Sequence, residues 1–450
     1  MNEIGDENLN KFLWKYKEAL KFLENQIGSF VSKMDAKGEY NPIEHFSGRI
    51  KSIDSIKGKL NRRGLEFSVD SITNNLEDIA GVRIVCHFMN DLNKMIEFIH
   101  KNPFIEVIEV EDYISNPKDS GYLSYHMTVK VPVMDDNHII YVPAEIQIRT
   151  MAMDMWASLE HKISYKHDLD KKISDKGVYY KIRSIIKNTS LETIKIDMEL
   201  KNIIDELEKN DENVLEGESY NISSDVVSSD VMEKYNLGLN NLKCIINEIF
   251  SGFNEEEKKS IELLKFRLKE PKSICKKLMS KNIYNVDEST IDNNLNDVIG
   301  GRIVCSFLSD MNAIIAAIVE YFGASNVRIK DYVTSPKPNG YSSYHILVKV
   351  PVYYKGKTEF LNAEIQVRTK AMNMWASFHH KLCYKKEISS DDMENIRIAG
   401  ILRDWALKIS KIDEEYDNIY NAIKENSILG NVNTSKVSNV KSKRRCLVKC

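Results

Sequence analysis

The sequence predicts an α+β protein that contains two copies of one domain, each a mixed, mostly antiparallel sheet flanked by helices. One observation is a long internal repeat. DIAGVRIVCHF from Asp78 returns as DVIGGRIVCSF from Asp297, at an offset of about 219 residues. The other is the pattern inside each copy, where stretches with helical spacing of apolar residues alternate with short strands rich in β-branched residues. A period this long indicates a duplicated domain and not a solenoid repeat.

Two further blocks repeat at the same offset. DYISNPKDSGYLSYHMTVKVPV from Asp112 returns as DYVTSPKPNGYSSYHILVKVPV from Asp331. AEIQIRTMAMDMWASLEHKISYK from Ala144 returns as AEIQVRTKAMNMWASFHHKLCYK from Ala363. Whatever chemistry one copy carries, the second copy is therefore expected to carry in a similar arrangement.

The repeats and the composition between them divide the chain into four parts. Residues 1–209 form the first copy and residues 231–426 the second, and the acidic, serine-rich stretch at 210–230 is typical of a linker. Residues 427–450 form a basic tail that we expect to be disordered. This tail is either a solvated extension or a segment that contacts RNA, the ribosome or an anionic surface.

Composition narrows the class of protein. With 450 residues, 42% of them hydrophobic and 29% charged, the chain fits a soluble globular protein of two or three domains. A formal net charge of −3 excludes a globally basic nucleic-acid coat. No apolar run reaches the roughly 20 residues of a membrane span, and the polar N-terminal stretch lacks the apolar core of a signal peptide. Most cysteines stand singly inside apolar runs, which indicates reduced thiols and a cytoplasmic location.

Helical spacing predicts two helices at the start of the first copy. Over residues 7–34, apolar side chains recur every three or four positions, as they do in an amphipathic helix. Residues 49–63 place three isoleucines and Leu60 on one helical face.

The strands come next. Residues 79–88 are rich in β-branched residues and lead into a helix at 91–100. Residues 124–134 and 138–150 are expected to form two strands, because Asp135, Asp136 and Asn137 between them have the composition of a hairpin turn. Another helix follows the second of these strands.

One face of the last strand is polar. Side chains alternate along a strand, so Glu145, Gln147 and Arg149 share one face while the residues between them share the other. A strand with only a structural role has no need of an acid, an amide and a base in a row. We therefore expect chemistry on this face.

The first candidate group is an acid pair, Asp78 and Glu145, matched by Asp297 and Glu364 in the second copy. Two carboxylates that a sheet brings together suit Mg²⁺, which takes one or two protein carboxylates together with phosphate oxygens of a substrate. The alternative is structural: Asp78 caps the end of a strand, and Glu145 forms an ion pair with an arginine.

The second candidate group is the run of basic residues in the helix predicted at 49–63. Cations three or four residues apart line one helix face and could hold a polyphosphate, although a solvated charged face has the same pattern. The members are Arg49, Lys51, Lys59, Arg62 and Arg63, matched by Arg267, Lys269, Lys272, Lys276 and Lys277.

The third candidate group is the loop PKDSGYLSYH. Lys118 can contact phosphate, Gly121 lets the backbone turn, Tyr122 offers a flat ring for stacking on a base, and His126 begins the next strand. The alternative is a turn with buried aromatic residues. The counterparts in the second copy are Lys337, Gly340, Tyr341 and His345.

Together these residues resemble the synthetase domain of the RelA/SpoT family, especially its short members, the small alarmone synthetases. The matching motifs are R-x-K followed by S-I-x-x-K, D-I-A-G-x-R, PK-x-x-GY-x-SYH and AEIQIRT-x-AM-x-x-WA-x-x-EH-x-x-x-YK, in the family's order and twice over. The resemblance implies a nucleotidyltransferase-like fold. It also implies transfer of the β,γ-pyrophosphate of ATP to the ribose 3′-hydroxyl of GDP or GTP, with release of AMP.

The resemblance assigns roles to the candidate residues. Asp78 and Glu145, and likewise Asp297 and Glu364, would be catalytic and bind Mg²⁺, with the glutamate also orienting or deprotonating the 3′-hydroxyl. The residues that would grip the ATP phosphates are Arg49, Lys51, Lys59 and Arg83, with Arg267, Lys269, Lys277 and Arg302. The residues that would bind GDP or GTP are Lys118, Tyr122, His126, Gln147, Arg149 and Asp154, with Lys337, Tyr341, His345, Gln366, Arg368 and Asn373.

The two copies depart from the family pattern in different ways. Leu123 and Ser342 replace the arginine often found after the GY pair, and Asp154 of the first copy becomes Asn373 in the second. Both copies keep their acids, so both are expected to be active, with unequal rate or acceptor preference. The metal-ligand set of the hydrolase region found in long family members is absent from the sequence, so no hydrolase activity is expected.

Other functions stay open at this point. The same transfer could be made to an adenine nucleotide or to a tRNA 3′ end. Alternatively, one copy could be a non-catalytic module that binds nucleotide or mediates dimerisation, either between chains or by pairing of the two copies within one chain.

Overall fold

The computed structural model describes residues 6–164, 176–211, 227–385 and 393–424. Most of the predicted linker and all of the predicted tail lie outside the described residues. Among the helices in the described ranges, none is long and apolar enough to cross a membrane.

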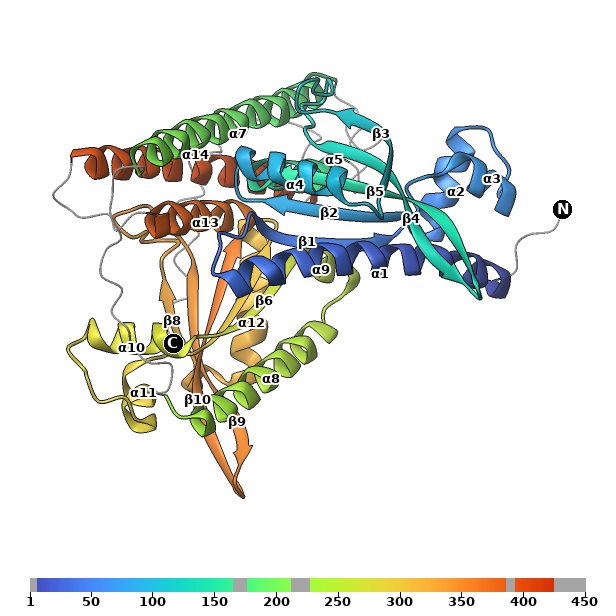
Figure 1. Cartoon of the computed structure of the whole chain (residues 1–450). Helices are drawn as coiled ribbons and strands as arrows, with labels where there is room; N and C mark the ends of the chain where they lie inside the picture. The colour runs from blue at the N-terminus through green and yellow to red at the C-terminus, as the bar shows by residue number, and fades with distance from the viewer. Residues whose placement is uncertain (1–5, 165–175, 212–226, 386–392, 425–450) are drawn as a thin grey trace. The chain divides into compact units, whose positions relative to one another are not determined.

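The chain divides into two compact units that follow the sequence repeat. The first consists of Met1–His161 and Tyr180–Asn210, and the second of Lys162–Tyr179 and Asp211–Cys450. Each unit contains one five-stranded sheet (Figure 1).

The sheet of the first unit has the strand order β1-β2-β5-β4-β3. β2 and β5 run parallel, and the other neighbouring pairs are antiparallel. The prediction of a mixed, mostly antiparallel sheet is therefore confirmed. The strands are β1 (Ile43–Ile50), β2 (Ala80–Cys86), β3 (Glu106–Asp112), β4 (Tyr125–Asp135) and β5 (His138–Thr150).

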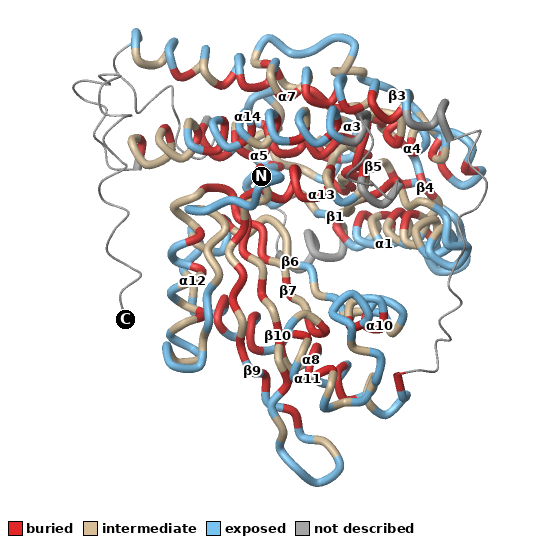
Figure 2. The backbone as a smooth tube through the Cα atoms, turned by 90° about the vertical axis from the view of Figure 1, so that its left-hand side faces the viewer, coloured by how far each residue is buried: buried red, intermediate tan, exposed pale blue. Residues whose placement is uncertain are grey.

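The sheet of the second unit repeats this topology as β6-β7-β10-β9-β8. Its one parallel pair is β7 with β10. Figure 2 shows buried stretches along β7, β9 and β10, with an exposed tip on the hairpin between β9 and β10. The strands are β6 (Ile261–Leu268), β7 (Ile299–Cys305), β8 (Arg328–Asp331), β9 (Tyr344–Tyr354) and β10 (Lys357–Thr369).

Helices cover the sheets in an α+β arrangement. Those of the first unit are α1 (Asp6–Lys37), α2 (Ile53–Arg62), α3 (Val69–Asn75), α4 (Met89–Lys101) and most of α5 (Met151–Ser164) and α7 (Lys176–Asp211). Those of the second are α8 (Ser229–Ser251), α9 (Glu255–Ser260), α10 (Pro271–Met279), α11 (Glu288–Asn294), α12 (Leu308–Phe322), the 3-10 helix η2 (Ala324–Asn326), α13 (Lys370–Lys385) and α14 (Met393–Lys424).

The first core lies between the sheet and two neighbouring helices. α1 runs along the sheet (Figure 1) and buries Tyr16, Leu23 and Ile27 completely. α4 packs beside it, with the rings of Phe30 and Phe98 4.6 Å apart. Burying large apolar side chains in this way provides the main driving force for folding of the unit.

The two faces of β5 differ as the sequence predicts. Ala144, Ile146 and Ile148 are fully buried on the core face, while Glu145 and Gln147 are partly exposed on the other. The alternation leaves one face of the sheet free for polar side chains.

The helix predicted at 49–63 is wrong in its first part. Arg49 lies in β1, and the Lys51 N–H extends the sheet by donating to the Ile79 carbonyl at 2.8 Å. The helix begins only at Ile53, where the Ser52 side chain caps it. The helical spacing was misleading at its start, because only Ile56 and Leu60 are buried by the helix, while Ile50 ends the strand and Ile53 is 36% exposed.

The second unit shows the same break. Arg267 lies in β6, the Lys269 N–H donates to the Val298 carbonyl at 2.9 Å, and α10 begins at Pro271. The basic residues of each copy are therefore shared between a strand, a connection and a helix, and they do not line one helix face.

A buried carboxyl ties the C-terminal helix of each unit to the end of the polar strand. The Thr150 hydroxyl donates to Asp197 on α7, and the Thr369 hydroxyl donates to Asp413 on α14 at 2.6 Å. Burial raises the pKa of Asp197 to about 7 and that of Asp413 to about 8, because a charged carboxylate would be poorly solvated there.

Replacing Asp197 by asparagine is expected to remove part of the pH dependence of stability. The folded-state pKa of about 7 lies above the ordinary value of 3.8, so stability falls as pH rises between these values. The loss should be on the order of a few kcal/mol in the wild type and absent in the variant. Urea unfolding between pH 4 and pH 8 measures it, with Glu192→Gln on the same helix as control. An unchanged pH profile in the Asp197→Asn protein would contradict a neutral buried acid.

Candidate active site

The candidate site of the first unit lies on the polar face of β5. Gly81 of β2 pairs with Glu145 on one side and with Arg49 of β1 on the other. Side chains of residues directly opposite each other share a face, so Arg49 and Glu145 flank a position without a side chain. In the second unit, a Cβ on Gly300 would come within 3.3 Å of Arg267 Cγ, so glycine makes room there for the arginine.

Five side chains of the first unit form a closed hydrogen-bonded ring. Arg149 donates to the Tyr122 hydroxyl and to Gln147 Oε1, the latter at 3.0 Å. Gln147 Nε2 donates to Glu145 Oε2 at 2.7 Å, and His126 Nδ1 lies 3.2 Å from Glu145 Oε1. The Tyr122 hydroxyl lies 2.9 Å from His126 Nε2, which completes the ring.

The ring has a direction. Assigning the His126 proton to Nδ1 satisfies every contact, because Nδ1–H then donates to Glu145 while Nε2 accepts from Tyr122. Both branches then run from the guanidinium of Arg149 to the carboxylate of Glu145. One passes through Tyr122 and His126, and the other passes through Gln147.

The second unit repeats the ring. Its distances are 2.7 Å from Arg368 to the Tyr341 hydroxyl, 2.7 Å from Arg368 to Gln366, 2.9 Å from Gln366 to Glu364, 2.7 Å between Tyr341 and His345, and 3.2 Å between His345 and Glu364. The sequence named all of these residues as site candidates without predicting that they bond to one another.

The ring keeps the central glutamate ionised. Burial alone raises the pKa of Glu145, but the hydrogen bonds from His126 and Gln147 outweigh it and leave the pKa below its usual value. Glu364 is lowered in pKa for the same reasons, through His345 and Gln366. Each site therefore presents a carboxylate at neutral pH.

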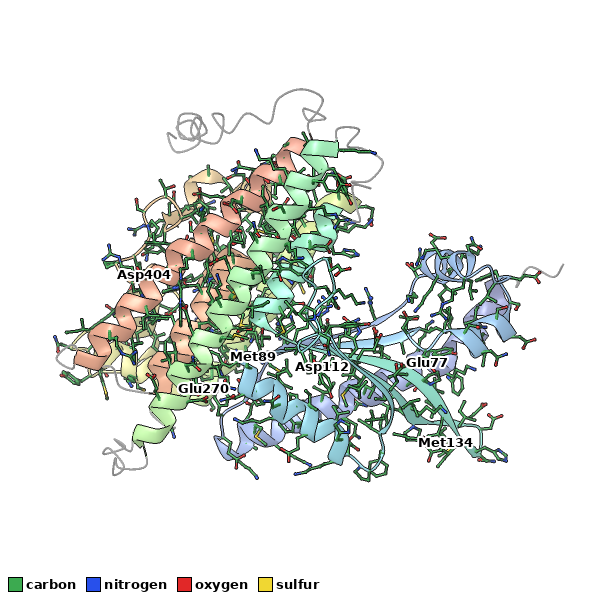
Figure 3. The ribbon with its side chains drawn as sticks, turned by 90° about the horizontal axis from the view of Figure 1, so that it is seen from above. Glu77, Met89, Asp112, Met134, Glu270 and Asp404 are labelled. Atoms are coloured by element: carbon green, nitrogen blue, oxygen red, sulfur yellow. The ribbon has the colours of Figure 1, made fainter. Side chains whose placement is uncertain are left out.

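The second acid of each site accepts hydrogen bonds from two lysines. Asp78 Oδ2 accepts from Lys51 and, at 2.8 Å, from Lys59. Burial raises the pKa of Asp78, but these two hydrogen bonds outweigh it, so the pKa lies below its usual value. Asp78 lies three residues before Gly81, which pairs with Glu145 across the sheet, so the two acids are close neighbours. Glu77, labelled in Figure 3, precedes Asp78 in the connection from α3 to β2.

Asp297 is held in the same way by Lys269 at 2.7 Å and Lys277 at 2.6 Å. Burial is again outweighed, and the hydrogen bonds lower the pKa of Asp297 to about 2. The lysines predicted to grip ATP phosphates thus contact the acids, whereas Arg49 and Arg267 are exposed.

A metal ion fits the acid pair. Asp78 Oδ1 and Asp297 Oδ1 are buried and have no hydrogen-bond partner among the described residues. A buried carboxylate oxygen without a partner is costly unless a donor or a cation completes it. No group of three or more His, Cys, Asp or Glu residues able to hold a metal occurs in the described ranges. Two carboxylates with substrate oxygens match Mg²⁺ better than a closed protein cage would.

The side chain that contacts the arginines next to the ring differs between the units. In the first, Asp154 Oδ1 lies 3.3 Å from Arg83 Nη1 and 3.4 Å from Arg149 Nη1. In the second, Arg302 Nη1 donates to the neutral amide oxygen of Asn373 at 3.3 Å. The second site therefore has one negative charge fewer beside its two arginines.

The loop before β4 carries the aromatic part of the site. Gly121 has a φ of 91°, a left-handed conformation that favours glycine, as the sequence predicts for the turn. Lys118 Nζ lies 4.0 Å from the ring centre of Tyr113 and 5.3 Å from that of Tyr122. His126 meets both tyrosine rings edge-on.

Tyr113 was missed by sequence reasoning. It follows Asp112 (Figure 3), whose carboxylate accepts from the N–H groups of Ile114 and Ser115 and so fixes the turn. Tyr332 takes the same place in the second unit, with Lys337 Nζ 4.8 Å from its ring centre. The recurring Asp-Tyr pair at the start of the second repeat block was the available signal.

Comparison with known proteins identifies the family. A family profile described as "Region found in RelA / SpoT proteins" matches residues 48–170 and 266–389, one match in each unit. The chain belongs to the RelA/SpoT family.

Named relatives of the chain include two proteins of Bacillus subtilis (strain 168). GTP pyrophosphokinase YwaC is 41% identical over 171 residues, which are 38% of this chain and 81% of the relative. GTP pyrophosphokinase YjbM is 33% identical over 164 residues, which are 36% of this chain and 76% of the relative. Each relative thus corresponds to a single copy of the repeat.

Solved structures include the small alarmone synthetase 1 of Bacillus subtilis bound to its product pppGpp. It is 31% identical, with a TM-score of 0.41, and the match covers 45% of this chain and 98% of that one. A GTP pyrophosphokinase family protein from Streptococcus pneumoniae is 33% identical, with a TM-score of 0.41, and the match covers 45% of this chain and 95% of that one.

Proposed function

We propose that the chain is a (p)ppGpp synthetase with two active sites, each transferring the β,γ-pyrophosphate of ATP to the ribose 3′-hydroxyl of GDP or GTP. The observation that carries the proposal is the ring around Glu145 and Glu364, which joins the tyrosine of the acceptor loop to an ionised carboxylate in both units. Relatives named GTP pyrophosphokinase support it.

The acceptor nucleotide would bind on the loop side of each site. Tyr122 would offer its ring to the base. Its hydroxyl is held by Arg149 and His126, and the rings of Tyr113 and His126 contact it edge-on, so its position is fixed. Lys118, whose Nζ lies over that ring at 5.3 Å from its centre, would contact the acceptor's phosphates. Glu145, at the far end of the ring of hydrogen bonds, would face the ribose.

The ATP phosphates would bind on the β1 side. Arg49 is exposed on the polar face, and Arg83 lies two residues from Gly81 on the neighbouring strand. Lys51 and Lys59 hold Asp78 now and have further donors for phosphate oxygens, since an ammonium group has three.

The proposed reaction is an in-line displacement at phosphorus. The acceptor's 3′-oxygen forms a bond to the β-phosphorus of ATP while the bond from that phosphorus to the α,β-bridging oxygen breaks, and AMP leaves with the electron pair. Glu145 takes the 3′-hydroxyl proton, and the lysines and arginines stabilise the charge that develops on the phosphate oxygens. Mg²⁺, held by Asp78 and Glu145, would supply further charge neutralisation.

Product analysis tests this proposal. The full chain would be incubated with ATP, Mg²⁺ and labelled GDP, GTP, ADP or tRNA in parallel, and the products separated by anion exchange. We expect a guanosine product with two added phosphates, together with an equal amount of AMP. Transfer to ADP or tRNA without a guanosine product would overturn the proposed acceptor, and no AMP release with any acceptor would overturn the reaction.

The charge difference at Asp154 predicts unequal sites. Replacing Asp154 by asparagine removes the carboxylate 3.3 Å from Arg83, so this arginine should bind ATP phosphates more strongly. The KM for ATP is expected to fall several-fold in a chain whose second site is inactivated by Glu364→Gln. The reciprocal control is Asn373→Asp with Glu145→Gln, for which the KM should rise. A change in the same direction in both chains would contradict this charge effect.

A further inference from the structure

The acceptor loop of each unit, which comes directly before β4 or β9, is held by a different contact. In the first unit, the Ser190 hydroxyl of α7 donates to the Gly121 carbonyl at 2.6 Å. In the second unit, the side-chain nitrogen of Asn339 lies 3.0 Å from Nε2 of His379 on α13. One loop is therefore anchored to the C-terminal helix of its unit, and the other is anchored to the helix that follows the polar strand.

The second unit cannot use the anchor of the first. Gly121 and Gly340 take the same place in the two loops, and a Cβ on them would meet Ser190 at 3.0 Å and Ala406 at 2.3 Å. Ala406 thus stands in α14 where α7 has Ser190, two residues after Asp404, which Figure 3 labels. An alanine has no hydroxyl to donate to the loop.

The anchor of the second unit depends on two exchanges of its own. Asn339 and His379 stand where the first unit has Ser120 and Glu160. Glu160 contacts α7 instead, with its Oε1 3.3 Å from Arg183. The loss of one loop anchor and the gain of another thus occur together in the second unit.

The contacts of Asn339 define the protonation state of its partner. Asn339 Oδ1 accepts from the Tyr341 N–H at 3.1 Å, which forms an Asx turn. Nδ2 is then the atom that faces His379, and an amide nitrogen can only donate. Nε2 of His379 must therefore accept, which requires a neutral imidazole with its proton on Nδ1.

Helix α14 runs antiparallel to α13, as two contacts show. The Thr369 hydroxyl donates to Asp413, and further along α13 Trp375 Nε1 donates to the Leu402 carbonyl at 2.9 Å. His379 is about one turn beyond Trp375, so it lies beside the part of α14 that precedes Leu402.

The surroundings of His379 oppose its protonation. Its ring stacks on Trp375, with ring centres 4.9 Å apart. Burial lowers the pKa of His379, and the positive charge of His380 lowers it further. The charged groups on the elements around it are cations with one exception. They are His380 on α13, Lys337 on the acceptor loop, and Arg397, Arg403 and the acid Asp404 on α14.

We propose that His379 is a positioning residue for the acceptor loop of the second unit, which its neutral ring holds in place through Asn339. When His379 gains a proton, Nε2 no longer accepts from Asn339, and the Asx turn that sets the position of Tyr341 loses its anchor. Binding of the acceptor nucleotide then weakens at the second site. The Ser190 hydroxyl does not titrate in this range, so the first site lacks this pH dependence. The inference rests on the function proposed above.

Steady-state kinetics between pH 5 and pH 8 tests the proposal. In the full chain with Glu145→Gln only the second site is active, and the KM for GDP is measured with and without His379→Gln. Glutamine accepts from Asn339 through its Oε1 at every pH because it carries no ionisable group. With His379 we expect KM to rise about fivefold as pH falls, at a midpoint below 6.5. With His379→Gln this rise should be absent, while kcat follows the same pH profile in both chains.

Three further variants in the same chain separate an anchor from a general structural role. His379→Ala removes the anchor, so KM should be raised at every pH. Ala406→Ser on that background offers the Gly340 carbonyl the hydroxyl that the first unit uses, and it should return KM to the His379→Gln value. His380→Gln removes a positive charge beside the ring, so the midpoint should move to higher pH.

The outcomes distinguish this inference from the proposed function. The same pH profile of KM with His379 and with His379→Gln would overturn the inference, and so would an unchanged KM in His379→Ala. If the Glu145→Gln chain releases no AMP at any pH, the proposed reaction of the second site fails instead. The anchor is then measured without turnover, by hydrogen exchange of the loop peptide around Tyr341 at pH 5.5. Exchange should be several-fold faster with His379 than with His379→Gln, and equal exchange would rule out the anchor.

Discussion

Replacing Glu145 and Glu364 together by glutamine is expected to abolish pyrophosphate transfer, with a fall in kcat of at least about a thousandfold. Glutamine keeps the size of the side chain and can still accept a hydrogen bond, but it can neither take the 3′-hydroxyl proton nor carry the charge that a metal ion requires. Because both rings are intact in the wild type, each single substitution should leave the activity of the other site.

The two single variants separate the sites. Steady-state rates of Glu145→Gln and Glu364→Gln, measured with ATP and GDP, should add up to the wild-type rate if the units work independently. GDP binding by calorimetry should stay within a few-fold of the wild type in each. If one single substitution removed all turnover while GDP still bound, the proposal of two active sites would be withdrawn.

Replacing Asp78 and Asp297 by asparagine is expected to lower kcat by about a hundredfold or more and to raise the Mg²⁺ concentration that gives half-maximal activity. An amide in place of each carboxylate removes the charge that holds two lysines, and it replaces one of the two carboxylate oxygens by an NH2 group, which does not bind a metal ion. The lysines would then be free to bind phosphate without opposition, so ATP should still bind.

The measurement that isolates the metal is a Mg²⁺ titration at saturating ATP and GDP. The matched control is Asp112→Asn, which changes a carboxylate that fixes a loop turn and does not touch the acid pair. A half-maximal Mg²⁺ concentration unchanged by Asp78→Asn and Asp297→Asn would rule out these acids as ligands.

Much of the fold could be predicted from the sequence because strand alternation is a strong signal. The polar and apolar faces of β5 and the hairpin around Asp136 follow from period and turn composition alone. β3 was missed because most of its side chains are exposed, so it has no buried stripe to reveal it. The last two residues of β1, Arg49 and Ile50, were taken for the start of a helix because they adjoin α2 without a turn signal, and the rest of β1 was not predicted.

The candidate site was predictable as a set of residues and not as a network. The alternation of side chains along one strand predicts that Glu145, Gln147 and Arg149 share a face. The contact of His126 with both Glu145 and Tyr122 depends instead on the register between β4 and β5. Register is set by pairing across the sheet, which no single segment encodes. The prediction for Lys51 and Lys59 missed their hydrogen bonds to Asp78, because the sequence shows the charge of a side chain but not its partner.

The direction of the ring has a consequence for tolerance to mutation. Two chains of hydrogen bonds hold the carboxylate of Glu145, one through His126 and one through Gln147. Loss of either one leaves the other in place. Both chains of hydrogen bonds start at the guanidinium of Arg149. Loss of the Arg149 side chain, which is only 4% exposed, would therefore remove the first hydrogen bond of both chains at once.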